Sequence, residues 1–149
     1  MIGFFIAMIS GALMSIQGVF NTQVTKVAGL WVSNFFVQLT ALIVCGVAWA
    51  AVDRKSMLKV FCVEPKYMLL GGVIGAFITC TVIQSMNRLG PAKAAMLIVI
   101  TQLFVAYLIE LFGLFGMEKK EFEWRKVIGM LIAIVGIVIF SMGSFKKEG

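Results

Sequence analysis

"AAMLIVITQLFVAYLIELFGLFGM" (residues 94–117) is an apolar run in which Glu110 is the only charged residue. A transmembrane helix needs about 20 apolar residues to cross a hydrocarbon core of about 30 Å, so this run is long enough to span a bilayer. An ionisable side chain inside such a helix is costly and tends to be functional. The run therefore predicts a membrane-spanning helix and marks Glu110 as the first candidate site residue.

The rest of the chain has the same apolar character. Hydrophobic residues make up 61% and charged residues 13%, and the mean hydropathy is +1.03; a soluble domain carries roughly 25% charged residues. Residues 1–25, 27–52, 67–87 and 127–145 carry no charge at all. We therefore predict an all-α, polytopic membrane protein, one membrane domain over residues 1–149. Its five transmembrane helices are expected at about 2–25, 29–52, 67–88, 91–114 and 125–144.

The first run is interpreted as a span and not as a secretory signal. No lysine or arginine precedes it, and no small-x-small cleavage site follows it. The only two prolines, Pro65 and Pro91, lie at the entrances of the third and fourth predicted helices, where a missing N–H costs least.

Several function classes are disfavoured by the residues that the chain lacks. It has no histidine, and its three cysteines form no C-x-x-C pair, so a Cys/His metal site is not expected. No catalytic triad, phosphate-binding glycine loop or carboxylate pair is present, and we expect neither an enzyme nor a cofactor. The net charge of +6 is scattered over short loops, which fits contact with anionic lipid headgroups better than nucleic acid.

The loop charges give a weak orientation bias. On the side of the N-terminus, here called side A, eight basic residues are expected, against five on the opposite side B. Loops rich in Lys and Arg stay in the cytoplasm, so side A is favoured there, but so small a difference also permits insertion both ways. Many secondary transporters consist of two inverted repeats around a central site. A five-span chain can form that architecture only as an antiparallel dimer.

Four segments carry a family resemblance. They are "GALMSIQGVFNTQV" (11–24), "GGVIGAF" (71–77), "RLGPAKAAMLIVITQLFVAYLIELFGLFG" (88–116) and "RKVIGMLIAIVGIVIF" (125–140). Together they resemble the bacterial YdcZ-type proteins, small five-span members of the drug/metabolite transporter superfamily, related to the small multidrug-resistance transporters. The resemblance implies one inverted-repeat half of a transporter fold, in the bacterial inner membrane. It also implies an antiparallel partner, which is either a second copy or an oppositely oriented homologous subunit.

Two departures limit what the resemblance implies. The acidic position before the final glycine is usually aspartate in the family, whereas it is Glu110 here. Small multidrug-resistance transporters carry their coupling glutamate in the first span, and this chain has no acid there. Their coupling chemistry is therefore not transferred to this chain.

Polar side chains inside the predicted spans are the candidate substrate or coupling residues. They are Glu110, Gln102, Tyr107, Gln17, Asn21, Asn34, Gln38 and Gln84. Gln17 shares a helical face with Asn21, four residues on, and Asn34 shares one with Gln38. Most of the amides lie toward side B, whereas Glu110 lies within about a turn of side A. Glu110 either extends to the headgroups or faces protein as a ligand contact, proton acceptor or helix-packing partner.

An antiparallel dimer would place the Gln17, Asn21 and Gln84 amides of one copy at the depth of Glu110 in the other. Small residues that allow close helix approach stripe the first and fifth helices. On the first helix they include Gly11 and Gly18. On the fifth we expect a dimer contact at Gly129, Ala133, Gly136 and Gly143.

The sequence thus predicts a secondary transporter that moves a small polar or cationic molecule by alternating access as an antiparallel dimer. Two alternatives stay open: a passive channel, and a non-transporting subunit that needs another protein for activity.

Overall fold

The computed structural model describes the backbone of residues 1–145 and the side chains of residues 1–140. Within residues 1–145 every regular element is a helix, as the sequence predicts. The helices group into two compact units, one comprising Met1–Arg88 and the other beginning at Leu89. The single membrane domain stays a prediction.

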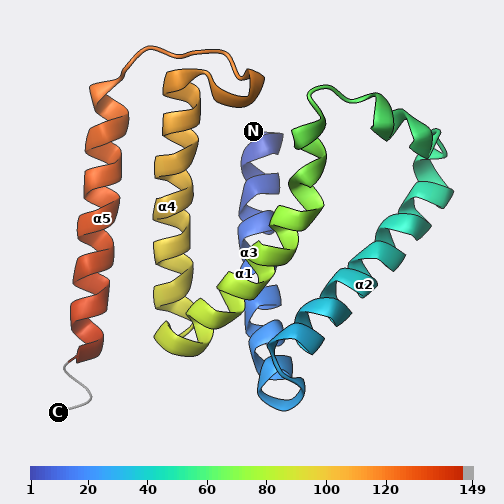
Figure 1. Ribbon diagram of the computed structural model, residues 1–149. Coiled ribbons are helices and arrows are strands. Elements are labelled where there is room, and N and C mark those ends of the chain that lie inside the picture. Colours follow the sequence, from blue (N-terminus) through green and yellow to red (C-terminus); the bar gives the residue numbers. More distant parts are fainter. Residues whose placement is uncertain (146–149) are drawn as a thin grey trace. The chain divides into compact units, whose positions relative to one another are not determined.

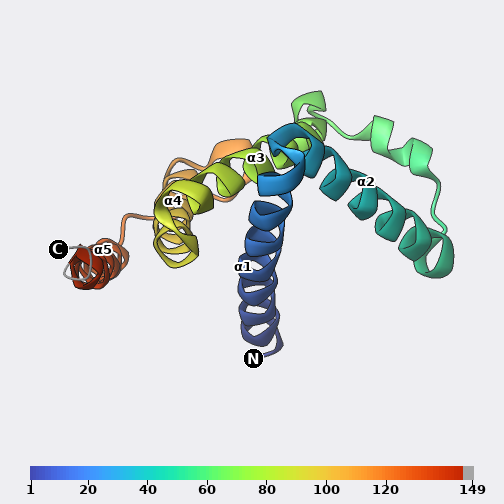
Figure 2. The same cartoon turned by 90° about the horizontal axis from the view of Figure 1, so that it is seen from below.

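The first unit contains three long helices. They are α1 (Ile2–Ala28), α2 (Leu30–Ala48) and α3 (Gly71–Leu89). The π-helical turn η1 (Trp49–Asp53) extends α2, and the 3₁₀ segments η2 (Met57–Cys62) and η3 (Lys66–Leu70) lead into α3. α1 and α2 meet at their common end and diverge from it, as both Figure 1 and Figure 2 show.

Glycine makes the junction of α1 and α2 possible. Gly29 has φ 85° and ψ 162°, a backbone conformation essentially restricted to glycine. Its N–H still donates to the Thr25 carbonyl, and its carbonyl accepts from the Ser33 N–H, so one residue ends α1 and begins α2. Gly90 adopts nearly the same conformation immediately before Pro91, the first residue of α4. Each glycine therefore separates two helices without a longer loop.

The buried core of the first unit is small and lies near the Gly29 junction. Ile83 and Ser33 are completely buried, and Met86, Cys80 and Asn34 are buried around them. Gly18 and Thr22 supply the contact from α1, where the Thr22 hydroxyl donates to the Gly18 carbonyl at 2.8 Å. The three helices are held together at this end by small and polar residues around Ile83 and Met86, and small and polar residues are usual where helices pack inside a membrane.

The second unit is a helical hairpin. It contains α4 (Pro91–Phe112), the 3₁₀ turn η4 (Leu114–Gly116) and α5 (Trp124–Phe145). α4 and α5 run antiparallel and side by side (Figure 1). The connection begins at Gly113, whose N–H donates to the Ile109 carbonyl and closes the last turn of α4.

Four helical stretches are long and apolar enough to cross a membrane: Ile2–Ala28, Leu30–Asp53, Lys66–Leu89 and Pro91–Phe112. They match the first four predicted spans, with end shifts of a few residues. α1 continues past Lys26 to Ala28 because the helix stops only at Gly29, and α4 stops at Phe112 because Gly113 turns the chain. α5 is 22 residues long, but its last residues lie outside the described side chains, so the fifth span stays a prediction.

Most large apolar side chains on these helices are exposed, including Phe35, Leu42 and Ile132. In water such surfaces would drive association. In a bilayer they are the expected lipid-facing or partner-facing surfaces.

Candidate substrate site

A pocket of about 380 Å³ lies between α4 and α5 at the end of the hairpin that carries the connection. Its lining divides into polar and apolar parts. The polar part consists of Tyr107, Glu110, Lys120 and Lys126, and the apolar part of Leu103, Ala106, Gly129 and Met130. Leu103, Ala106, Tyr107 and Glu110 recur at three- and four-residue steps, so α4 presents one face to the pocket.

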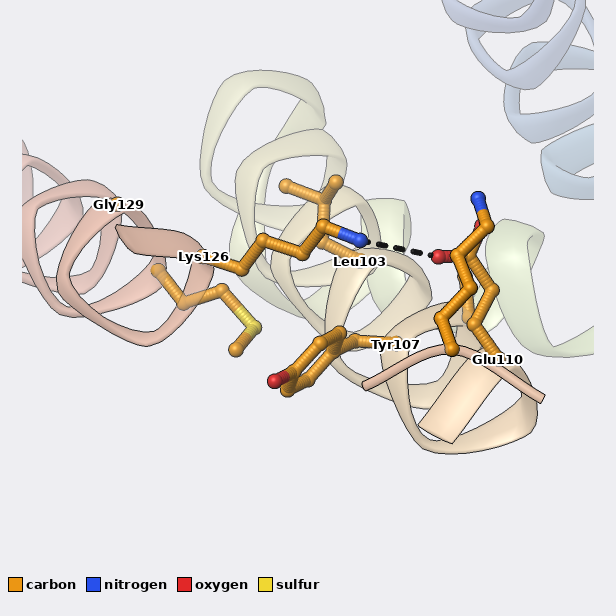
Figure 3. Close-up of a pocket in the computed structure, with 8 residues that line it drawn as sticks. Leu103, Tyr107, Glu110, Lys126 and Gly129 are labelled. Atoms are coloured by element: carbon orange, nitrogen blue, oxygen red, sulfur yellow. Dashed lines mark hydrogen bonds and ion pairs between the residues drawn. The ribbon is translucent and has the colours of Figure 1, made fainter. Parts of the chain in front are cut away.

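Glu110 is held between two lysines. Lys120 Nζ lies 3.4 Å from Glu110 Oε1, and Lys126 Nζ lies 3.3 Å from Oε2. The Glu110 side chain is 32% exposed. In Figure 3, Lys126 extends from α5 toward the Glu110 carboxylate on α4, with the Tyr107 ring beside them. Each carboxylate oxygen therefore has its own ammonium partner, and both partners line the same pocket.

A backbone hydrogen bond from the connection holds Lys120 beside Glu110. The Lys120 N–H donates to the Glu110 carbonyl oxygen at 2.9 Å, so Lys120 contacts Glu110 through both its backbone and its side chain. Residues 113–123 return to the end of α4 before α5 starts, which explains why a loop lysine reaches a span residue.

Tyr107 is the buried residue of the polar part of the lining. Its side chain is 8% exposed, and its hydroxyl oxygen accepts a hydrogen bond from the Glu123 N–H at 3.1 Å. Lys126 Nζ lies 5.6 Å from the centroid of the Tyr107 ring, within cation–π range. Phe122 packs against the same ring at 6.4 Å between centroids. Tyr107 thus ties the connection to α4 and positions Lys126.

A second polar cluster lies in the first unit, between α2 and α3. Asn34 Nδ2 donates to the Ala76 carbonyl at 3.1 Å and approaches Cys80 Sγ at 3.0 Å. Gln38 Nε2 lies 3.4 Å from Thr79 Oγ1 and 3.5 Å from Asn34 Oδ1. These amides form an interhelical network, which is also the ordinary way in which polar side chains join helices in a membrane.

The profile of the DMT_YdcZ family, described as "Putative inner membrane exporter, YdcZ", matches residues 2–139. That match covers all five helices except the end of α5. The chain belongs to this family. No curated protein and no solved structure matches the chain.

Membership of the DMT_YdcZ family confirms the resemblance inferred from the sequence and makes the chain a multi-pass inner-membrane protein. The family's description is that of an exporter, not of an enzyme, and it agrees with a role in transport. Within the described residues, no group of three or more Cys, Asp or Glu side chains could hold a metal ion.

The structure places the predicted substrate residues in three different settings. Glu110 and Tyr107 line the pocket, whereas Gln102 is exposed on α4 and outside it. Asn21 and Asn34 are buried in the first unit, and Gln38 is half-buried beside Asn34. Gln17 and Gln84 are exposed. The predicted face pairing of Asn34 with Gln38 is seen as a contact, and the roles of all these residues stay predictions.

The predicted dimer residues on α5 also lie in different surroundings. Gly129 lines the polar pocket, and Ala133 lines an adjoining apolar pocket of about 170 Å³. Gly136 is exposed, whereas Gly143 lies outside the residues whose side chains are described. Gly136 therefore is free within this unit to contact a partner, while Gly129 also borders the space between α4 and α5.

Sequence reasoning missed Lys120 and Lys126 as site residues and counted them only among the eight basic residues of side A. One signal could have found them. Lys120 lies in the short segment between the fourth and fifth predicted spans and Lys126 at the start of the fifth, so both have to lie near the end of the fourth helix, where Glu110 is. The contribution of Cys80 to the Asn34 network had no such signal, because it depends on how α2 and α3 cross.

Proposed function

We propose that this chain is a secondary exporter of a small molecule and that it works by alternating access as an antiparallel dimer in the inner membrane. The observation that carries the proposal is the pocket between α4 and α5, in which Glu110 is paired with Lys120 and Lys126. Ionisable side chains within a membrane span are uncommon and tend to be functional, which favours a functional role for Glu110. Family membership supports transport independently.

In this mechanism Glu110 is the switching residue. With the site empty, its carboxylate is neutralised by the two lysines. Substrate that enters the pocket competes for these partners, and Glu110 is then released to accept a proton or to contact the polar residues of the opposite subunit. Since each ion pair is only partly buried, its exchange costs little. A site that exchanges partners easily suits a carrier that has to bind and release in every cycle.

The antiparallel partner would complete the site. A second copy in the opposite orientation brings Gln17, Asn21 and Gln84 to the depth of Glu110. Gln17 and Gln84 are exposed in the single chain and are available to such a partner. The exposed apolar surfaces of α1, α2 and α5 supply the area that an inverted second copy would cover.

Export from loaded proteoliposomes tests the proposal. Vesicles containing the wild type are loaded with a defined metabolite mixture, and mass spectrometry follows which compounds leave, with protein-free vesicles as the background. We expect saturable export that is accelerated by the same compound outside. Glu110→Gln should lower the rate by about 100-fold or more, the scale of losing a proton-transfer group.

Glu121→Gln is the matched control, because Glu121 is an exposed carboxylate on the same connection and does not line the pocket. Its export rate should equal that of the wild type. Flux that never saturates and shows no exchange would identify a channel and contradict alternating access. Equal rates for Glu110→Gln and the wild type at every pH would remove Glu110 from the mechanism.

A further inference from the structure

We propose that the pocket between α4 and α5 binds the anionic group of a small amphipathic organic acid, whose apolar body lies in the adjoining groove. This inference rests on the proposed transport function and names the class of its substrate. Glu110 considered alone suggests a cationic or polar substrate. The lysines that the structure places beside it reverse that preference.

The charges of the pocket lining favour an anion. Two ammonium groups, of Lys120 and Lys126, face one carboxylate, that of Glu110. A bound monoanion gives two positive and two negative groups and leaves the lining neutral. A bound cation would instead raise an existing excess of positive charge. Glu123 also pairs with Lys126, at 3.6 Å, but it does not line the pocket, so the lining by itself keeps one excess positive charge.

The donors available in the pocket are also those that an anion requires. Each lysine carries three N–H donors; the contact with Glu110 uses one, and in Lys126 the contact with Glu123 uses a second, so each ammonium keeps at least one. The Tyr107 oxygen already accepts the Glu123 N–H, so its own O–H is left to donate. Residues of α4, α5 and the connection thus each bring a donor to the lining of one pocket, and charge-assisted hydrogen bonds to a carboxylate are the strong kind.

The adjoining groove, which is the apolar pocket beside the polar one, favours an apolar body on the ligand. The apolar pocket of about 170 Å³ shares Leu103 and Met130 with the polar pocket, so the two adjoin. Its other lining residues are Ile100, Thr101, Phe104, Ala133 and Ile134, none of which is charged. From Glu110 to Ile100 the groove follows α4 for about 15 Å toward the middle of the membrane. A ligand with a charged head and an apolar chain matches this sequence of surfaces.

Binding of octanoate tests the inference on the intact chain in phosphatidylcholine nanodiscs, with titration calorimetry and empty nanodiscs as the reference. Octanoate should bind at least about tenfold more tightly than butyrate, because each buried methylene adds about fourfold in affinity. Octylammonium should not compete. Lys126→Gln should weaken octanoate binding by about tenfold or more, as expected for one charge-assisted hydrogen bond.

Two further variants separate a binding role from a structural one. Lys119→Gln removes the same charge from the connection at a residue that does not line the pocket, and should leave affinity within about twofold. Glu110→Gln removes the carboxylate that competes for the lysines, so octanoate should bind several times more tightly. A variant that merely damaged the fold would bind less.

Three outcomes overturn the inference. The first is that octylammonium binds in place of octanoate, and the second is that octanoate affinity is unchanged in Lys126→Gln. The third is that octanoate does not bind at all, while phosphatidylglycerol is retained by the wild type and lost from Lys126→Gln. The last would assign the pocket to a lipid headgroup. Octanoate binding without flux in proteoliposomes would refute the transporter and keep the site. Saturable flux of another compound with no anion binding would refute the site and keep the transporter.

Discussion

Met86 of α3 packs directly against Gly18 of α1, so closely that a methyl group added to Gly18 would lie 2.5 Å from Met86 Cε and 2.6 Å from Sδ. Met86 is 5% exposed, so a side chain larger than alanine at Gly18 would have to displace it inside the core. Gly11, two turns earlier on α1, has no atom within 4 Å of the corresponding position. The two glycines look equivalent in the sequence, but only Gly18 is required by packing.

Gly18→Leu should destabilise the first unit by about 1–3 kcal/mol, the range for overpacking a tight contact. Gly18→Ala should cost less, because the end of the Met86 side chain is flexible. Gly11→Leu should leave stability unchanged, and Met86→Ala should partly rescue Gly18→Leu. The measurement is the thermal midpoint in detergent, read by size-exclusion chromatography after heating. Equal midpoints for the Gly11 and Gly18 variants would contradict the packing described.

Asn34→Ala should loosen the contact of α2 with α3. The variant loses the hydrogen bond to the Ala76 carbonyl and the contact with Cys80 Sγ, and interhelical hydrogen bonds of this kind contribute about 0.6–2 kcal/mol in membranes. Cys80, which is buried, should then react faster with a small maleimide. Gln84→Ala, an exposed amide on α3, is the control and should not change this rate.

The orientation of the chain can be read from Cys62, which is exposed in η2. Cys45→Ala and Cys80→Ser leave it as the only thiol, and serine keeps an acceptor near Asn34. With a membrane-impermeant maleimide, we expect about half of the chains in intact cells to label, and all after permeabilisation, because the loop charges barely favour one orientation. Labelling only after permeabilisation would mean one fixed orientation and would require an oppositely oriented homologous subunit.

The long apolar helices could be predicted from the sequence. A charge-free run of about 20 residues has few alternatives to a helix in a membrane. The end of α1 could not be placed at Lys26, since a charge at a membrane surface does not stop a helix, whereas Gly29 does. The same limit applies to α4, which ends at the turn made by Gly113 and not where apolar residues run out.

The candidate site could be predicted only in part. Glu110 and Tyr107 were found because polar side chains inside apolar runs are conspicuous. Their partners Lys120 and Lys126 resemble ordinary loop lysines, and only the return of the connection onto α4 gives them a role. A sequence shows which side chains are unusual for their surroundings, but the charge of a site depends on residues from several elements.

Tyr107→Phe should release the connection between α4 and α5 without removing any charge from the pocket. The Glu123 N–H then loses its acceptor, and a hydrogen bond of this kind contributes about 0.5–1.5 kcal/mol. Amide hydrogen exchange at Glu123 should therefore become faster by a factor of about 2–10. The Lys120 amide, which donates to the Glu110 carbonyl and not to Tyr107, is the internal reference and should exchange at its original rate. Faster exchange at both amides would mean that the Tyr107 hydroxyl holds the whole connection and not Glu123 alone, and unchanged exchange at both would mean that it holds none of it. The expected pattern makes Tyr107 the residue that keeps Lys126 beside Glu110, because the segment that leads into α5 is anchored at this hydroxyl.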